Sequence, residues 1–186
     1  MDTKKDFPIF KNNKNKYPLI YFDNASTTQK PQCVIDDIVN FYSNYNANVH
    51  RGAYGIAEKS TLEYENAREE VAKFINAEKK EIVFTKGTTE SINLIAYTFE
   101  RILKNGDEII ISEMEHHSNI LPWQMIKEKK NIDIKYIPVL ENGELDIQKL
   151  DSFITKKTRL ISIISMSNIL GTINDISTIS LIAKKK

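Results

Sequence analysis

Residues 108–119, EIIISEMEHHSN, pass from an apolar run directly into a polar loop. The run is short and rich in isoleucine, which is typical of a buried strand. Two other segments have the same form: an apolar run at 81–85 precedes GTTE at 87–90, and another at 159–164 precedes SNILGT at 167–172. Open α/β sheets place their ligand site at the carboxyl ends of successive strands, so these loops are expected to form a site there.

The rest of the chain alternates between strand and helix patterns. Strands are predicted at 81–85, 108–112, 132–138 and 159–164. Helices are predicted from Pro31 as the first helical position, from a capping-box sequence at Ser60 to near Asn76, from Thr89, through Trp123, at 146–153 and at 175–183. The alternation predicts βαβ units and a mostly parallel sheet in an α/β fold. Residues 1–20 are expected to form a loosely docked arm before one domain at 21–186.

Composition excludes several classes of protein. Of 186 residues, 26 are basic and 25 acidic, so the net charge of +1 gives no reason to expect nucleic acid or a membrane surface as partner. The single cysteine, Cys33, excludes an internal disulfide. No apolar run approaches the ~20 residues of a membrane span, and residues 1–16 lack the apolar core of a secretory signal. The expected location is therefore the cytoplasm.

The segment GTTES at 87–91 separates a predicted strand from a predicted helix. Gly87 permits a tight turn, while Thr88 and Thr89 place hydroxyls and unpaired N–H groups at a helix N-terminus, where phosphate binds well. A simple threonine N-cap explains the same residues. The segment is not a Walker A loop, because the Gly-Lys-Ser/Thr ending is missing.

His116 and His117 are adjacent, so their side chains diverge and seldom bind one metal; a zinc site is therefore poorly supported. One reading is a buried, hydrogen-bonded histidine beside a solvated one. The other is an imidazole stacked on an aromatic cofactor, with the second histidine aiding proton transfer or packing.

Four more residues have a chemical and a structural interpretation. Asn168, which follows a buried strand and precedes Gly171, could donate to a phenolate oxygen or simply occupy a turn. The pair His50-Arg51 could serve an anionic substrate or phosphate, or belong to a surface loop. Cys33 is interpreted as an inert thiol, in the core or half-buried on the first long helix, rather than as a nucleophile.

The combined order of these segments resembles the N-terminal half of a group II cysteine desulfurase. The resemblance runs from about Leu19 to the last residue and rests on DNA at 23–25, NVHRG at 48–52, GTTESINL at 87–94, MEHHSN at 114–119 with PWQ at 122–124, and SNILGT at 167–172. Such enzymes have the class V aminotransferase fold, that of the fold type I large domain, depend on pyridoxal 5'-phosphate and work in the Suf iron–sulfur assembly pathway.

The resemblance implies how the cofactor would be bound. Thr88 and Thr89 match the pair that cradles its phosphate. His116 matches the imidazole that stacks on the pyridine ring and assists protonation steps. Asn168 matches the partner of the phenolic oxygen.

It also implies the substrate and the partners. Asn24 and Ala25 match a loop near the substrate carboxylate, and His50 and Arg51 match a loop near the active site. The implied reaction converts L-cysteine to L-alanine and passes the sulfur, through a persulfide on an enzyme cysteine, to a Suf-type acceptor protein. The implied quaternary state is a homodimer.

The family's chain is roughly twice as long as this one, and its Schiff-base lysine and nucleophilic cysteine lie in the other half. Tyr54 and Ser165 stand where many relatives have histidine. The isolated chain is therefore expected to form no covalent lysine–cofactor bond. It is also expected to be poorly stable, because the strand at 81–85 loses its neighbours and the strand at 159–164 exposes an apolar edge. The run of lysines at 184–186 suggests a frameshift or truncation.

Three alternatives remain open at this point. A selenocysteine lyase of the same family would share these segments. A non-catalytic remnant that binds a sulfur-acceptor or scaffold protein, or a generic phosphate-binding α/β module, would account for them without chemistry.

Overall fold

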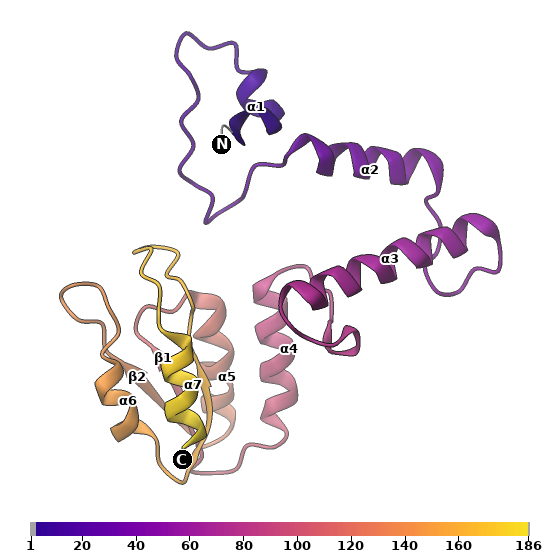
Figure 1. The fold of residues 1–186 in the computed structure, drawn as a ribbon. Helices are drawn as coiled ribbons and strands as arrows, with labels where there is room; N and C mark the ends of the chain where they lie inside the picture. Colours follow the sequence, from indigo (N-terminus) through magenta and orange to yellow (C-terminus); the bar gives the residue numbers. More distant parts are fainter. Residues whose placement is uncertain (1–2, 186) are drawn as a thin grey trace. The chain divides into compact units, whose positions relative to one another are not determined.

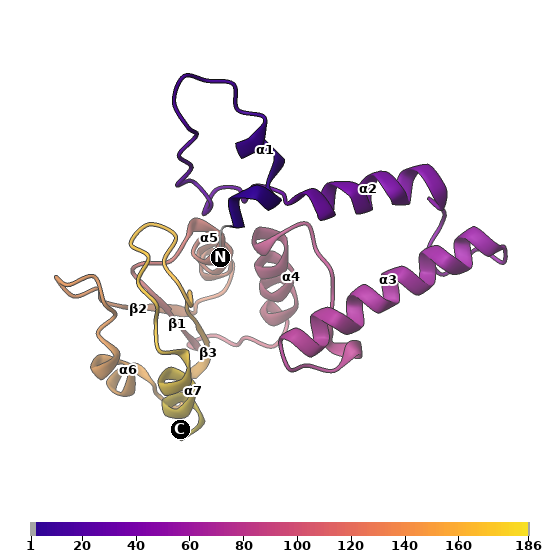
Figure 2. The same cartoon turned by 45° about the horizontal axis from the view of Figure 1, so that its top comes forward.

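The computed structural model describes residues 3–185, which fall into two compact units on either side of the Val83–Phe84 peptide bond. Figures 1 and 2 show the elements of each unit. Residues 1–2 of the expected arm and Lys186 of the terminal lysine run lie outside the described residues. Within residues 3–185, no helix is long and apolar enough to cross a membrane.

The first unit is helical. Its elements are η1 (Thr3–Asp6), α1 (Pro8–Lys11), α2 (Gln32–Asn44), α3 (Gly55–Phe74) and η2 (Lys79–Glu81). Pro31 is the N-cap of α2, one residue before the first helical position that was predicted for it. Cys33 on α2 is exposed, so the prediction that this thiol lies in the core or half-buried was wrong. Asn76 follows α3 with a φ of +56°, a left-handed conformation that asparagine tolerates and that ends helices.

The predicted start of α3 was wrong. The helix begins at Gly55, after an extended Tyr54, rather than at the capping-box sequence around Ser60. Ser60 is buried inside the helix, and its hydroxyl donates to the carbonyl oxygen of Tyr45 at 2.5 Å. Because that hydroxyl bonds a carbonyl of the preceding loop, it does not cap a helix N-terminus.

The second unit is an α/β layer structure. It contains α4 (Thr88–Glu100), β1 (Glu108–Ser112), η3 (His117–Asn119), α5 (Leu121–Lys129), β2 (Asp133–Ile137), α6 (Ile147–Phe153), β3 (Thr158–Ser162) and α7 (Ile176–Lys184). The strands form one sheet in the order β2-β1-β3, and both pairings are parallel. The predicted α/β fold with a parallel sheet is confirmed.

The central strand β1 has a core on each face. Ile109, Ile110 and Ile111 are fully buried, and burial of each side chain stabilises the fold by about 2 kcal/mol. One core gathers residues of α4, α5, β1 and β2 around Trp123, and the other gathers residues of β1, β2, α6 and α7 around Leu150. Helices therefore cover both faces of the sheet, as parallel strands require.

The predicted strand at 81–85 was wrong. Glu81 ends η2, and no residue of 82–85 pairs with a strand in the described part of the chain, so the sheet has three strands instead of four. An extended segment becomes a strand only when a neighbour exchanges backbone hydrogen bonds with it. The expectation that this segment would lack neighbours, and that β3 would be an edge, agrees with the observed strand order.

An ion pair holds β3 to the amino end of β1. Asp107 is buried, and its carboxylate accepts a hydrogen bond from the Lys104 N–H at 2.8 Å and one from Arg159 Nε at 3.0 Å. These contacts, the Lys104 N–H first, lower the pKa of Asp107 from its usual 3.8 despite its burial.

This lowered pKa predicts an acid-dependent loss of stability. Above pH 3.8 the contribution of the Asp107 carboxylate is fully present, and it disappears as the pH falls through the lowered pKa. Urea unfolding, followed by the fluorescence of the single Trp123, should show Asp107→Asn less stable than the wild type at pH 7. The difference in the free energy of unfolding between the two proteins should shrink below pH 3.8. A difference that stays constant down to pH 2 would show that it does not come from the ionised Asp107 carboxylate.

Candidate functional site

The polar loops of the second unit meet at the carboxyl end of its sheet. Figure 1 shows the N-terminus of α4 and the loops after β1 and β3 at the upper end of this unit. The helix α4 packs against η3, which brings the first turn of one element close to the loop that follows β1. Thr88, Thr89, His116 and Asn168 all belong to this end of the sheet.

A buried carboxyl group joins the ends of β1 and β3. Glu115 Oε1 accepts hydrogen bonds from the Ser112 hydroxyl at 2.5 Å and from the Ile164 N–H at 2.8 Å. Glu115 Oε2 accepts from Asn119 Nδ2 at 2.7 Å. Because the donors come from β1, the β3–α7 loop and η3, one side chain fixes the relative position of all three segments.

Asn119 extends this set of hydrogen bonds around Glu115, here called the Glu115 brace, into the core. Its Nδ2 also donates to the Ser162 carbonyl at 3.2 Å, and its Oδ1 accepts from the Ser162 hydroxyl at 2.7 Å and from Trp123 Nε1 at 2.9 Å. Asn119 and Trp123 are buried, so each of these bonds satisfies a group that water does not reach. The loop that carries the two histidines is therefore rigidly anchored on both sides.

His116 lies on the exposed side of this anchored loop as the N-cap of η3. Its Nδ1 accepts from the Ser118 N–H at 3.1 Å and lies 2.9 Å from the Ser118 hydroxyl. A nitrogen that accepts from a backbone N–H carries no proton, so the neutral ring is protonated at Nε2. His117 meets the ring edge to face at 6.2 Å and is also exposed, so neither of the two is the buried histidine considered from the sequence.

The N-terminus of α4 presents two exposed threonines. Gly87, the N-cap, has a φ of +157°, a conformation that glycine adopts at little cost. Glu90 Oε2 accepts from the Lys86 N–H at 2.6 Å, which closes the preceding turn. Among the residues that the structure describes, no hydrogen bond engages the Thr88 or Thr89 hydroxyls or their N–H groups.

Asn168 lies in a tight turn between β3 and α7. The Ser167 hydroxyl accepts from the N–H groups of Ile169 and Leu170, and Gly171 has a φ of +73°. Met166 and Ile173 form an antiparallel bridge that closes the turn. Asn168 is exposed at its tip, so the turn interpretation is correct and the amide is also accessible to a ligand.

The remaining predicted site residues belong to the first unit. Asn24 and Ala25 form an exposed turn, in which the Asp23 carbonyl accepts from the Ser26 N–H at 3.1 Å. Arg51 is exposed in the turn beside His50. The structure thus groups Thr88, Thr89, His116 and Asn168 in one unit and these four residues in the other.

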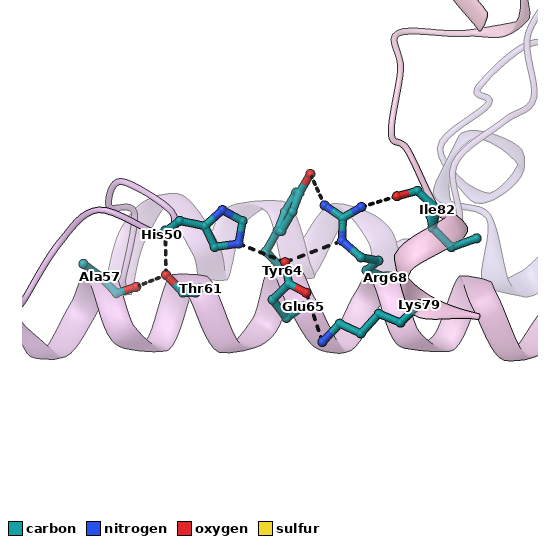
Figure 3. Close-up of polar contacts among 8 residues, drawn as sticks. All are labelled: His50, Ala57, Thr61, Tyr64, Glu65, Arg68, Lys79 and Ile82. Carbon is teal, nitrogen blue, oxygen red and sulfur yellow. Dashed lines mark hydrogen bonds and ion pairs between the residues drawn. The ribbon is translucent and has the colours of Figure 1, made fainter. Parts of the chain in front are cut away.

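His50 is held against α3, as Figure 3 shows. Its φ of +72° is left-handed, which costs a non-glycine residue about 1 kcal/mol. The His50 N–H donates to Thr61 Oγ1 at 2.9 Å, and Nε2 lies 2.9 Å from Glu65 Oε1. The ring also lines a shallow pocket with Gly52, Glu58, Thr61, Leu62 and Glu65, so a ligand can reach it.

Sequence reasoning missed two carboxyl groups that organise these loops. Glu115 entered the sequence argument only as a neighbour of the histidines, and Glu65 did not enter it at all. Each contacts residues distant in sequence: Glu115 bonds Ile164, and Glu65 bonds His50. A burial pattern could have singled out Glu115, since an acidic residue that directly follows a buried strand rarely lacks a partner.

The chain matches the model of the aminotransferase class-V family over residues 20–186. It is 48% identical over 180 residues to a cysteine desulfurase of Wigglesworthia glossinidia brevipalpis, with 96% of this chain and 44% of the relative covered. The chain spans less than half the length of that curated relative.

Solved structures agree with this match. The apo structure of a cysteine desulfurase from Thermococcus onnurineus NA1 superimposes with a TM-score of 0.91 at 38% identity, covering 99% of this chain and 44% of that one. A mutant of the protein C-DES, with glycine covalently linked to its PLP cofactor, gives a TM-score of 0.78 at 20% identity, covering all of this chain and 46% of that one. The second likeness shows the fold alone.

The Glu115 brace predicts a measurable loss of stability. In Glu115→Gln an amide NH₂ replaces one acceptor, so at least one buried donor loses its partner, at a cost of about 1–3 kcal/mol. Urea unfolding monitored by Trp123 fluorescence measures this loss. Glu141→Gln, an exposed glutamate, is the matched control and should change stability by less than about 0.5 kcal/mol. If Glu115→Gln and Glu141→Gln unfold at the same urea concentration, the hydrogen bonds of Glu115 do not contribute to the free energy of unfolding.

Proposed function

Because the chain belongs to the aminotransferase class-V family, we propose that it supplies the cofactor-binding part of a cysteine desulfurase that depends on pyridoxal phosphate. The observation that carries this proposal is the exposure of Thr88, Thr89, His116 and Asn168 at one end of the parallel sheet. The names of the relatives support cysteine as the substrate.

The residues at this end fit the cofactor. The unbonded hydroxyls and N–H groups of Thr88 and Thr89 would hold its phosphate at the positive end of α4. His116 would lie against the ring and pass protons through Nε2, since Nδ1 is engaged by Ser118. Asn168 would donate its amide N–H to the phenolic oxygen. When bound, the cofactor supplies the electron sink that allows the C–S bond of cysteine to break.

The finer parts of the function are also proposals. The enzyme would convert L-cysteine to L-alanine and pass the sulfur as a persulfide to a Suf-type acceptor protein for iron–sulfur cluster assembly, in the cytoplasm and as a homodimer. Asn24, Ala25 and Arg51 would serve the substrate, and His50 would be a catalytic residue in addition to His116. Residues 1–186 by themselves would not turn over cysteine, since they span only 44% of the Wigglesworthia relative.

A chimaera tests the activity. It joins residues 1–186 to the part of the Wigglesworthia relative that they do not match, and alanine is measured after addition of pyridoxal phosphate and L-cysteine. We expect alanine from the chimaera and none from residues 1–186 alone. A folded chimaera that binds the cofactor yet forms alanine only from selenocysteine would identify a selenocysteine lyase, and one that forms none from either substrate would favour a non-catalytic remnant.

The same chimaera tests the phosphate site. Replacing both Thr88 and Thr89 with valine removes two hydroxyl donors, so we expect the cofactor to bind at least about tenfold more weakly in an absorbance titration. The matched control is Thr98→Val, on the same helix, where the hydroxyl only bonds the Leu94 and Ile95 carbonyls. If the double variant and the control bind pyridoxal phosphate with the same affinity, Thr88 and Thr89 do not bind its phosphate.

A further inference from the structure

One face of α3 carries a continuous line of polar contacts. Thr61, Tyr64, Glu65 and Arg68 recur at spacings of three, one and three residues, which places them on the same side of the helix. Figure 3 shows their side chains directed toward the His50 loop at one end and toward Lys79 and Ile82 at the other. The line therefore joins two segments that are about thirty residues apart in sequence.

Three residues of this face define the position of His50. Thr61 accepts its backbone N–H at 2.9 Å, and Tyr64 meets its ring edge to face with centroids 5.7 Å apart. Glu65 Oε1 lies 2.9 Å from His50 Nε2 and is the only one of the three contacts that reaches a ring nitrogen. Glu65 thus controls which nitrogen of the ring faces away from the helix.

Glu65 is itself held as an anion. Lys79 Nζ lies 3.0 Å from Glu65 Oε2, and Arg68 Nε lies 3.5 Å from Oε1. The hydrogen bond from Lys79, followed by the one from His50, lowers the pKa of Glu65 from its usual 4.5 to about 2. Arg68 is fixed in turn, because it donates to the Ile82 carbonyl and, at 3.2 Å, to the Tyr64 hydroxyl.

An ionised carboxylate accepts hydrogen bonds and cannot donate them. His50 Nε2 must therefore carry the proton in its contact with Glu65, and the neutral ring keeps a lone pair only on Nδ1. The His50 side chain is 52% exposed and lines the shallow pocket, so this lone pair remains accessible. A carboxylate that orients a histidine and selects its tautomer is a recurring arrangement in proton-transfer sites.

We propose that Glu65 is a positioning residue for His50: it fixes the orientation of the imidazole and keeps its proton on Nε2, so that Nδ1 is the nitrogen that accepts a proton or hydrogen bond from a bound substrate. This inference rests on the proposed function for the role of His50 in the reaction. The Glu65–His50 contact itself does not depend on the reaction.

The test is the protonation state of the His50 ring. With ¹⁵N-labelled histidine, long-range ¹H–¹⁵N correlation spectra of the 186-residue chain at neutral pH distinguish a protonated from an unprotonated ring nitrogen. His50→Gln identifies the His50 signals among those of the three histidines. We expect one tautomer with the proton on Nε2 in the wild type. In Glu65→Ala and Glu65→Gln, we expect His50 signals that are averaged over both tautomers.

Two controls separate positioning from stabilisation. Lys79→Met removes an ion pair of Glu65 but leaves its contact with His50, so the His50 signals should stay as in the wild type. Glu63→Gln changes an exposed glutamate on another face of α3 and should also leave them unchanged. Circular dichroism checks that each variant keeps its helices, and Glu65→Gln preserves the size of the side chain if Glu65→Ala does not fold.

Unchanged His50 signals in a folded Glu65→Gln or Glu65→Ala would overturn the proposal. In the chimaera, Glu65→Gln should lower turnover by roughly tenfold or more, while Lys79→Met and Glu63→Gln should not. If the chimaera forms no alanine at all, the proposed function fails, but the spectra still decide whether Glu65 positions His50.

Discussion

The parallel pairing of β1 with β2 on one side and β3 on the other is the constraint on which the second unit depends. Parallel strands need helical crossovers, and these return the chain to the same end of the sheet each time. All three strands therefore end at one edge. Burial of Ile109, Ile110 and Ile111 fixes β1 between two helix layers, and the polar loops that follow β1 and β3 are brought together as a consequence.

Proximity alone does not make those loops rigid. The carboxyl group of Glu115 and the amide of Asn119 connect the end of β1 to the end of β3 through hydrogen bonds that are buried or partly buried. Because every member of this network has a partner, breaking one bond leaves another group unsatisfied. His116 can thus be exposed to a ligand while the backbone that carries it is held in place.

The first unit uses a different physical arrangement. His50 lies on a loop in a left-handed conformation, and this conformation persists because α3 supplies partners for both its backbone and its ring. The ion pairs of Glu65 with Lys79 and Arg68 are partly exposed and contribute little stability by themselves. Their main consequence is to keep a charged acceptor beside an exposed imidazole.

The α/β class and the three strands were predictable from the sequence itself, because short apolar runs at 108–112, 132–138 and 159–164 alternate with helical patterns. The motif segments also placed Thr88 and Thr89 at a helix N-terminus, and His116 and Asn168 in loops after strands, since each segment follows an apolar run.

The tertiary structure alone decided the rest. The segment at 82–85 is not a strand, because strand formation depends on a neighbour that no local pattern encodes. Ser60 bonds the Tyr45 carbonyl instead of capping a helix, because Gly55–Glu58 continue the helix upstream. Glu115 and Glu65 became organising residues through partners far away in sequence, Ile164 and His50. Local propensity determines which elements form, whereas contacts between distant residues determine which side chains hold the site.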